Sequence, residues 1–128
     1  MRREAERELS GFTGFIPVDA AAEDTGLARH SVDFITVAQA FHWFDADRFR
    51  DECRRILKPG GRVVLIWNSR MSEAALIKDN DAVCRKYCPD FGGFSGGSAE
   101  GPDACAGFFL DGCDFAVFQN NRMLTLDQ

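Results

Sequence analysis

The sequence predicts an α/β fold built on a parallel sheet, and three observations support this expectation. Residues 33–38 and residues 62–67 are apolar runs rich in β-branched side chains, and neither run alternates as a half-exposed strand does. Such runs are typical of parallel strands that are buried on both faces. Between them lies a segment whose apolar residues recur at i, i+4, i+7 and i+8, the spacing of one helix face: Phe49, Cys53, Ile56 and Leu57.

The ends of this central helix are marked by residues with specific backbone preferences. Asp45 is a favourable N-cap, because its side chain can accept a hydrogen bond from the first turn. Pro59, Gly60 and Gly61 are expected to stop the helix before the second strand begins. Strand, helix, tight turn and strand together form a βαβ unit, for which we expect a right-handed crossover.

The segments on either side of this unit carry weaker patterns. Good helix formers with Arg and Glu three or four residues apart predict helices, short apolar runs predict strands, and stretches rich in glycine and proline predict loops. In chain order these are a helix over 2–9, a strand over 15–18, a loop over 19–27, a helix over 73–87, a loop over 89–103, a short helix over 103–110, and a hairpin of residues 115–118 and 123–126.

Composition and charge restrict the classes of function. The chain has 128 residues, 45% of them hydrophobic, and a formal net charge of -5, which disfavours binding to the phosphate backbone of nucleic acid. Its densest basic cluster, Arg54, Arg55 and Lys58, falls in the last turn of the predicted helix, where it complements the helix dipole. No apolar run approaches the ~20 residues of a membrane span. We therefore expect no nucleic-acid partner and no membrane partner.

The five cysteines favour reduced thiols. An odd number of cysteines, mostly inside apolar patterns, is typical of packed side chains in a cytoplasmic protein. Cys84 and Cys88 are four residues apart and could share a helix face, but a zinc site would need two more ligands. Both histidines, His30 and His42, lie far upstream of this pair. We therefore expect a cytoplasmic protein without a metal site.

Two segments that flank the predicted helix resemble a known family. The run AQAFHWFD at residues 38–45 follows the first strand, and RILKPGGR at residues 55–62 precedes the second. At this spacing they resemble class I S-adenosylmethionine-dependent methyltransferases of the subgroup called methyltransferase type 11. The two strands then correspond to the fourth and fifth of the family's sheet, and residues 22–27 are similar to the segment after its third strand. The resemblance implies a single partial methyltransferase-like domain over residues 1–128, truncated at both ends.

The resemblance also implies transfer of a methyl group from S-adenosylmethionine to a small-molecule acceptor. Such an enzyme holds donor and acceptor in line and excludes water, and it needs a base only where the acceptor must lose a proton. The cofactor then lies over the carboxyl ends of the parallel strands. The positions that match the family's site are Ala22 and Glu23 at the adenine ring, Gln39 at the methionine portion, and His42, Trp43 and Asn68 on the acceptor side.

Each of these positions has a purely structural alternative. Without a cofactor, Ala22 and Glu23 would simply form a solvated turn. A histidine in an aromatic stretch is often a packed, hydrogen-bonded side chain, and aromatic residues before a helix often anchor it. The alternatives are therefore packing for His42, anchoring of the helix for Trp43 and Phe44, and strand termination for Asn68.

The family's glycine-rich turn, close to Gly-x-Gly-x-Gly after its first strand, has no counterpart in this sequence. The acidic residue that ends the family's second strand and takes the ribose hydroxyls is also absent. In the family's strand order, 3-2-1-4-5-7-6, the missing first and second strands lie between the third and the fourth. We therefore expect an α/β fold with a partial Rossmann-like methyltransferase sheet that lacks its first two strands.

A gap at the centre of the sheet would leave strand edges unpaired, at ~1–3 kcal/mol for each backbone group that stays dry. Three outcomes follow: residues 15–18 close up against residues 33–38, or the chain forms a homodimer or higher oligomer, or the segment before Ser31 is poorly ordered. Two functions remain open. One is a methyltransferase whose activity in this chain alone is weak or absent, and the other is a non-catalytic methyltransferase-like scaffold that acts through self-association or a partner chain.

Overall fold

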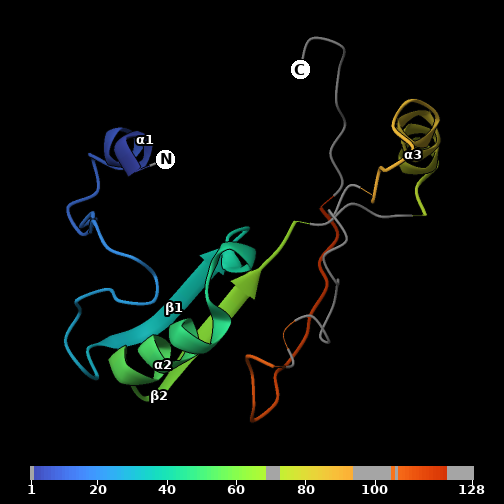
Figure 1. Cartoon of the computed structure of the whole chain (residues 1–128). Coiled ribbons are helices and arrows are strands. Elements are labelled where there is room, and N and C mark those ends of the chain that lie inside the picture. Colours follow the sequence, from blue (N-terminus) through green and yellow to red (C-terminus); the bar gives the residue numbers. More distant parts are fainter. Residues whose placement is uncertain (1, 69–72, 94–104, 106, 121–128) are drawn as a thin grey trace. The chain divides into compact units, whose positions relative to one another are not determined.

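The computed structural model describes residues 2–68, 73–93, 105 and 107–120, and its architecture is the predicted mixture of helices and parallel strands (Figure 1). The chain divides into two compact units, Met1–Ser69 and Arg70–Gln128. In chain order the elements are α1 (Arg2–Glu8), β1 (Val32–Ala38), the 3-10 helix η1 (Phe41–Trp43), α2 (Ala46–Ile56), β2 (Leu57–Ile66) and α3 (Ala75–Tyr87).

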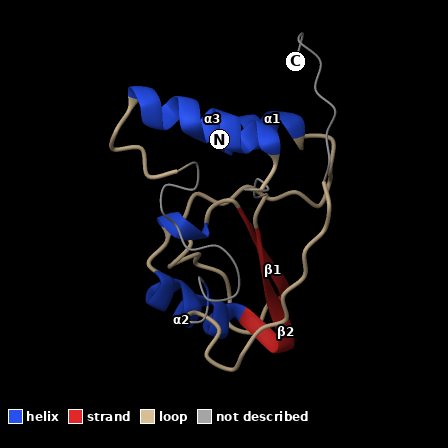
Figure 2. Ribbon diagram, turned by 90° about the vertical axis from the view of Figure 1, so that its right-hand side faces the viewer, coloured by secondary structure: helices blue, strands red, loops and turns tan. Residues whose placement is uncertain are grey.

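The first unit is organised around the predicted βαβ motif. β1 and β2 pair in parallel, with Ile35 opposite Val63 and Val37 opposite Leu65. The helix α2 connects the two strands and lies on one face of them (Figure 2). The predictions of both strands and of the helix between them are therefore confirmed.

The helix α2 forms where its capping residue and its apolar spacing place it. The Asp45 side chain accepts a hydrogen bond from the Arg48 amide at 3.1 Å, as predicted for an N-cap. Phe49, Cys53 and Ile56 are all buried on the face that turns toward the strands. Burial of this apolar stripe is the main source of the helix's stability, because isolated helices of this length are marginal in water.

Pro59, Gly60 and Gly61 were predicted to separate the helix from the second strand, but they lie within that strand. The helix ends at Ile56, and residues 59–61 lie inside β2, opposite an irregularity in the register between Val32 and Phe34. A Cβ atom at Gly61 would lie 2.8 Å from Leu57 Cδ2 and 3.1 Å from the Asp33 carbonyl oxygen. A side chain at position 61 would therefore crowd the Asp33 carbonyl of β1, and the absence of a Cβ atom allows the close approach of the two strands. The expectation that Lys58 lies in the last helical turn is wrong.

The prediction that both strands are buried on both faces is also wrong. Ile35 and Val37 face α2, whereas the opposite face leaves Phe34 58% exposed and Ile66 47% exposed. Local sequence sets the strand, but burial needs a second layer and neighbours at both edges. Within the described residues, β1 pairs only with β2.

The segment that precedes β1 is not a strand. Residues 15–18 pair with no other segment of the described chain, and Ile16 and Val18 are 77% and 53% exposed. The prediction of a strand here is wrong, and the rearrangement in which this segment closes against β1 does not form. The loop predicted over 19–27 is confirmed, with a single bridge between Ala21 and Asp24.

The second unit contains α3, which begins two residues later than predicted and ends at Tyr87 as expected. Ion pairs join Glu73 to Lys78 and Asp81 to Arg85 along this helix. The predicted strand over 115–118 is wrong, since these residues have no regular structure. Its partner over 123–126, most of the predicted loop over 89–103, and residues 103, 104 and 106 of the predicted short helix lie outside the described residues. None of the helices in the described ranges has the length and apolar character needed to cross a membrane.

Candidate functional site

The carboxyl ends of β1 and β2 bring two of the predicted site residues together. Gln39 follows β1 and donates its backbone amide to the Ile66 carbonyl at 3.0 Å. Its side-chain nitrogen donates to the carbonyl of Asn68 at 3.2 Å. Gln39 also has a φ of 53°, a left-handed conformation that costs about 1–2 kcal/mol for a residue other than glycine. Strained residues of this kind cluster at functional sites.

Ala22 and Glu23 lie in a turn that is fastened to α2. The Glu23 carboxylate accepts a hydrogen bond from the Asp45 amide at 2.8 Å, just before the helix begins. Two residues later, the Thr25 amide and hydroxyl both donate to Glu52, at 2.9 and 2.5 Å. The turn is therefore held at two points along the helix. Ala22 and Glu23 are half-buried, so this turn is not simply solvated.

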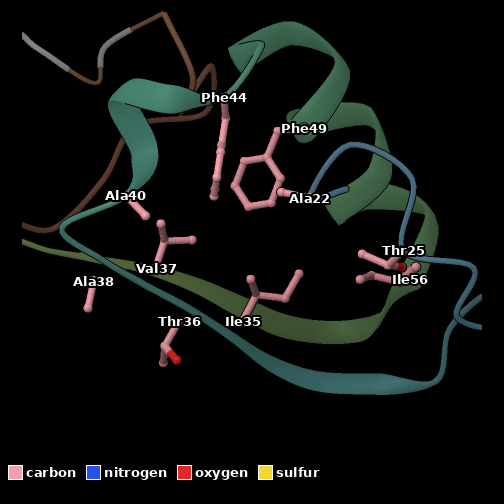
Figure 3. A pocket seen from close by; sticks show the side chains of 10 residues that line it. All are labelled: Ala22, Thr25, Ile35, Thr36, Val37, Ala38, Ala40, Phe44, Phe49 and Ile56. Atoms are coloured by element: carbon pink, nitrogen blue, oxygen red, sulfur yellow. The ribbon is translucent and has the colours of Figure 1, made fainter. Parts of the chain in front are cut away.

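An apolar hollow of about 260 Å³ lies between this turn, β1 and α2 (Figure 3). Ile35 and Val37 point from the strand toward the rings of Phe44 and Phe49, whereas Thr36 points away. Pockets for complete small molecules usually have volumes of about 300–1,000 Å³, so this hollow suits only part of a larger ligand. Its lining consists of Ala22, Thr25, Ile35, Thr36, Val37, Ala38, Ala40, Phe44, Phe49 and Ile56.

His42 and Trp43 lie in η1 and are exposed, Trp43 at 77%. Their ring centroids are 4.8 Å apart. The structural alternatives for these two residues, a packed histidine and a tryptophan that anchors the helix, are therefore wrong. The anchor is Phe44, whose ring lies 4.9 Å from that of Phe49 at the start of α2. A role of His42 and Trp43 toward an acceptor stays a prediction.

A buried carboxylate that the apolar spacing of the helix did not predict, Glu52, lies on α2 next to the turn of residues 22–27. The side chain of Glu52 is 5% exposed and receives Arg55 Nε at 2.6 Å, in addition to its two bonds from Thr25. The Arg55 guanidinium, together with the Thr25 hydroxyl and amide, lowers the pKa of the Glu52 carboxyl to about 2, although burial acts in the opposite direction. Arg55 also donates to the Leu27 carbonyl at 2.7 Å.

The pairing of Glu52 with Arg55 could have been predicted from the sequence. Glu52 is three residues after Phe49 and four before Ile56, so it falls on the apolar face of the predicted helix. An acidic residue there needs a partner, because an unpaired buried charge is costly. Arg55, one turn later, is at the spacing that supplies one. The partner at Thr25 could not be read from spacing, since 27 residues separate it from Glu52.

The thiols of the chain are distributed over both units. Burial raises the pKa of the Cys53 thiol to about 12 and also raises the pKa of Cys105, so both stay protonated and unreactive at neutral pH. Cys84, Cys88 and Cys113 are free and less buried. Among the residues that the structure describes, no group of three or more His, Cys, Asp or Glu side chains is arranged as metal ligands.

Known proteins resemble this chain mainly over its first unit. The family model described as a methyltransferase domain matches residues 1–65. An uncharacterized methyltransferase of Mycobacterium tuberculosis (strain H37Rv) is 43% identical over 58 residues, which cover 45% of this chain and 24% of that protein. An uncharacterized methyltransferase-like protein of Schizosaccharomyces pombe is 29% identical over 102 residues, 80% of this chain and 39% of its own length.

A solved structure assigned as a type II methyltransferase, from Anaeromyxobacter dehalogenans, is 41% identical, with a TM-score of 0.40. The match covers 53% of this chain and 28% of that one. The chain thus spans between about a quarter and two fifths of the length of these relatives. Because the family model covers half of the 128 residues, the chain belongs to the methyltransferase domain family.

Proposed function

We propose that this chain carries part of a site for transfer of a methyl group from S-adenosylmethionine to a small-molecule acceptor. One observation carries the proposal: Gln39 and Asn68 are hydrogen-bonded at the carboxyl ends of two parallel strands. In open α/β sheets this is the edge where ligands bind. Membership of the methyltransferase domain family gives the reaction type.

The residues present suit two ends of the cofactor. The turn at Ala22 and Glu23 borders an apolar hollow that is large enough for part of a ligand. This hollow would bind the adenine ring of the cofactor. The Gln39 amide would lie at the methionine portion. The glycine-rich turn that would approach the remainder has no counterpart in residues 1–128, so we expect this chain to supply only some of the contacts.

When bound, S-adenosylmethionine supplies the methyl group as part of a sulfonium ion. The chain's own contribution is to orient this donor and to exclude water from the reacting centre. The exposed pair His42 and Trp43 offers the acceptor an aromatic surface. No residue of this chain is assigned a covalent role.

The proposal is tested by titrating the chain with S-adenosylmethionine in a calorimeter. We expect weak binding, with a dissociation constant of about 0.1–1 mM, or about 4–5.5 kcal/mol. Gln39→Ala should weaken the binding of S-adenosylmethionine about fivefold. The substitution removes the side-chain amide that we expect to donate one hydrogen bond to the cofactor, and such a bond is worth about 1 kcal/mol. The same substitution at the exposed Gln119 serves as the control and should have no effect. No heat up to millimolar cofactor would contradict the proposal.

We propose, as a second candidate, a scaffold that self-associates through the free edge of β1. The supporting observation is that, within the described residues, β1 pairs on one edge only. A second copy offers an identical edge, and antiparallel pairing about a two-fold axis would satisfy the backbone groups of both copies.

Sedimentation velocity tests this second candidate. We expect a concentration-dependent homodimer that Thr36→Lys disrupts, because the substitution brings like charges together across the two-fold axis. Val64→Lys places the same charge on β2, opposite Thr36, and should leave the dimer intact. A wild-type chain that stays monomeric at all concentrations would refute self-association.

A further inference from the structure

We propose that Glu52 is a positioning residue that holds the turn of residues 22–27 in the conformation needed to border the cofactor's adenine ring. The inference rests on the proposed function for the identity of the ligand. Glu52 lies on the buried side of α2, and its Oε1 atom accepts from both the amide and the hydroxyl of Thr25. It would not touch the cofactor, and it would act through Thr25.

The contacts around Glu52 converge on this turn. Arg55 binds both oxygens of the carboxylate, at 2.6 and 2.8 Å, and also donates to the Leu27 carbonyl. The Leu27 amide in turn donates to the Thr25 hydroxyl at 3.3 Å. A carboxylate and a guanidinium from one helix therefore fix both ends of a three-residue segment. An apolar residue at position 52 would fill the same space but could accept none of these bonds.

Other contacts hold the neighbouring segments independently of Glu52. The His30 and Ser31 amides donate to the carbonyls of Arg55 and Ile56, at 3.1 and 2.8 Å. At the other end, Glu23 is bonded to the Asp45 amide. Loss of the carboxylate should therefore release residues 24–27 and leave β1 in place. A residue with a purely stabilising role would instead loosen the whole βαβ unit when it is replaced.

The test compares Glu52→Leu with wild type by hydrogen exchange. Leucine keeps the helix and the apolar packing but leaves Arg55 without its carboxylate partner, so the free energy of global unfolding should also fall. Urea denaturation of the variant measures this global loss, which is subtracted before the local effect is read. We expect the Thr25 and Leu27 amides to exchange at least about tenfold faster, a change of about 1.4 kcal/mol in local opening. The Ser31 amide and the amides of β1 and β2 should show no acceleration beyond the measured loss of global stability.

Two controls separate positioning from other effects. Asp51→Leu makes the same change at the neighbouring exposed position and should leave the Thr25 amide unaffected. Thr25→Val removes the hydroxyl bonded to Glu52 and should accelerate exchange at Leu27, whereas Thr25→Ser keeps the hydroxyl and should retain the wild-type rate. Unchanged exchange at Thr25 in Glu52→Leu, or equal acceleration throughout β1 and β2, would overturn the proposal.

A titration with S-adenosylmethionine, followed by amide chemical shifts, completes the test. Glu52→Leu should bind at least about tenfold more weakly than wild type, which corresponds to about 1.4 kcal/mol. Equal affinity of the two chains would overturn the positioning role even if the turn becomes mobile. If wild type does not bind the cofactor, the proposed function fails. Localised exchange at residues 24–27 would then still support the action of Glu52 on the turn.

Discussion

Replacing Phe49 by alanine should lower the free energy of unfolding of the first unit by about 3–5 kcal/mol. Phe49 is 5% exposed, and its ring lies 4.9 Å from that of Phe44 and 6.3 Å from that of Phe41. Truncation removes apolar area from the core and leaves a void that joins the existing hollow. Domains are stable by only about 5–15 kcal/mol, so this single change should bring the first unit close to unfolding.

Urea denaturation of the chain, followed by tryptophan fluorescence, measures this loss. The matched control is Phe34→Ala, which removes the same atoms from a side chain that is 58% exposed. We expect the control to lower the free energy of unfolding by less than about 1 kcal/mol, because surface substitutions rarely cost more. Similar losses for the two variants would mean that the face of the sheet bearing Phe34 is buried in solution and that the core is not centred on Phe49.

The elements of the βαβ unit could be predicted because their signals are local. The apolar spacing from Phe49 to Ile56 and the cap at Asp45 act within the helix itself, and the two β-branched runs pair as neighbouring strands. The segment 15–18 had a comparable apolar run but is not a strand. A strand needs a neighbouring strand to pair with, and the apolar run alone does not show whether one is available.

The candidate site also combines features that local sequence predicts with features that depend on long-range packing. The juxtaposition of Gln39 and Asn68 follows from sequence order, since each comes directly after one of two parallel strands. The exposure of Trp43 and the bond between Thr25 and Glu52 depend on how separate segments pack. Strand order therefore predicts that Gln39 and Asn68 lie at one edge of the sheet, whereas the bond from Thr25 to the buried carboxylate depends on long-range packing.

The free energy of unfolding should also fall in acid, by an amount that depends on Glu52. The pKa of this carboxyl is lowered from 4.5 to about 2 in the folded chain, first by the Arg55 guanidinium and then by Thr25. A carboxyl whose pKa is lower in the folded state binds fewer protons there than when unfolded. Its contribution is therefore fully present above about pH 4.5 and is lost as the pH falls toward 2.

We expect this contribution to be on the order of 2 kcal/mol, since each unit of pKa corresponds to about 1.4 kcal/mol and the site lies close to solvent. Urea denaturation at a series of pH values between 5 and 2 measures it. Glu52→Gln should flatten the acid limb, so that its curve approaches that of wild type as the pH falls, whereas Asp51→Asn should reproduce the wild-type slope. If Glu52→Gln keeps the full slope, the acid sensitivity arises from other carboxylates. The folded chain would then gain little from the ion pair between Glu52 and Arg55 or from the Thr25 bonds to the ionised carboxylate.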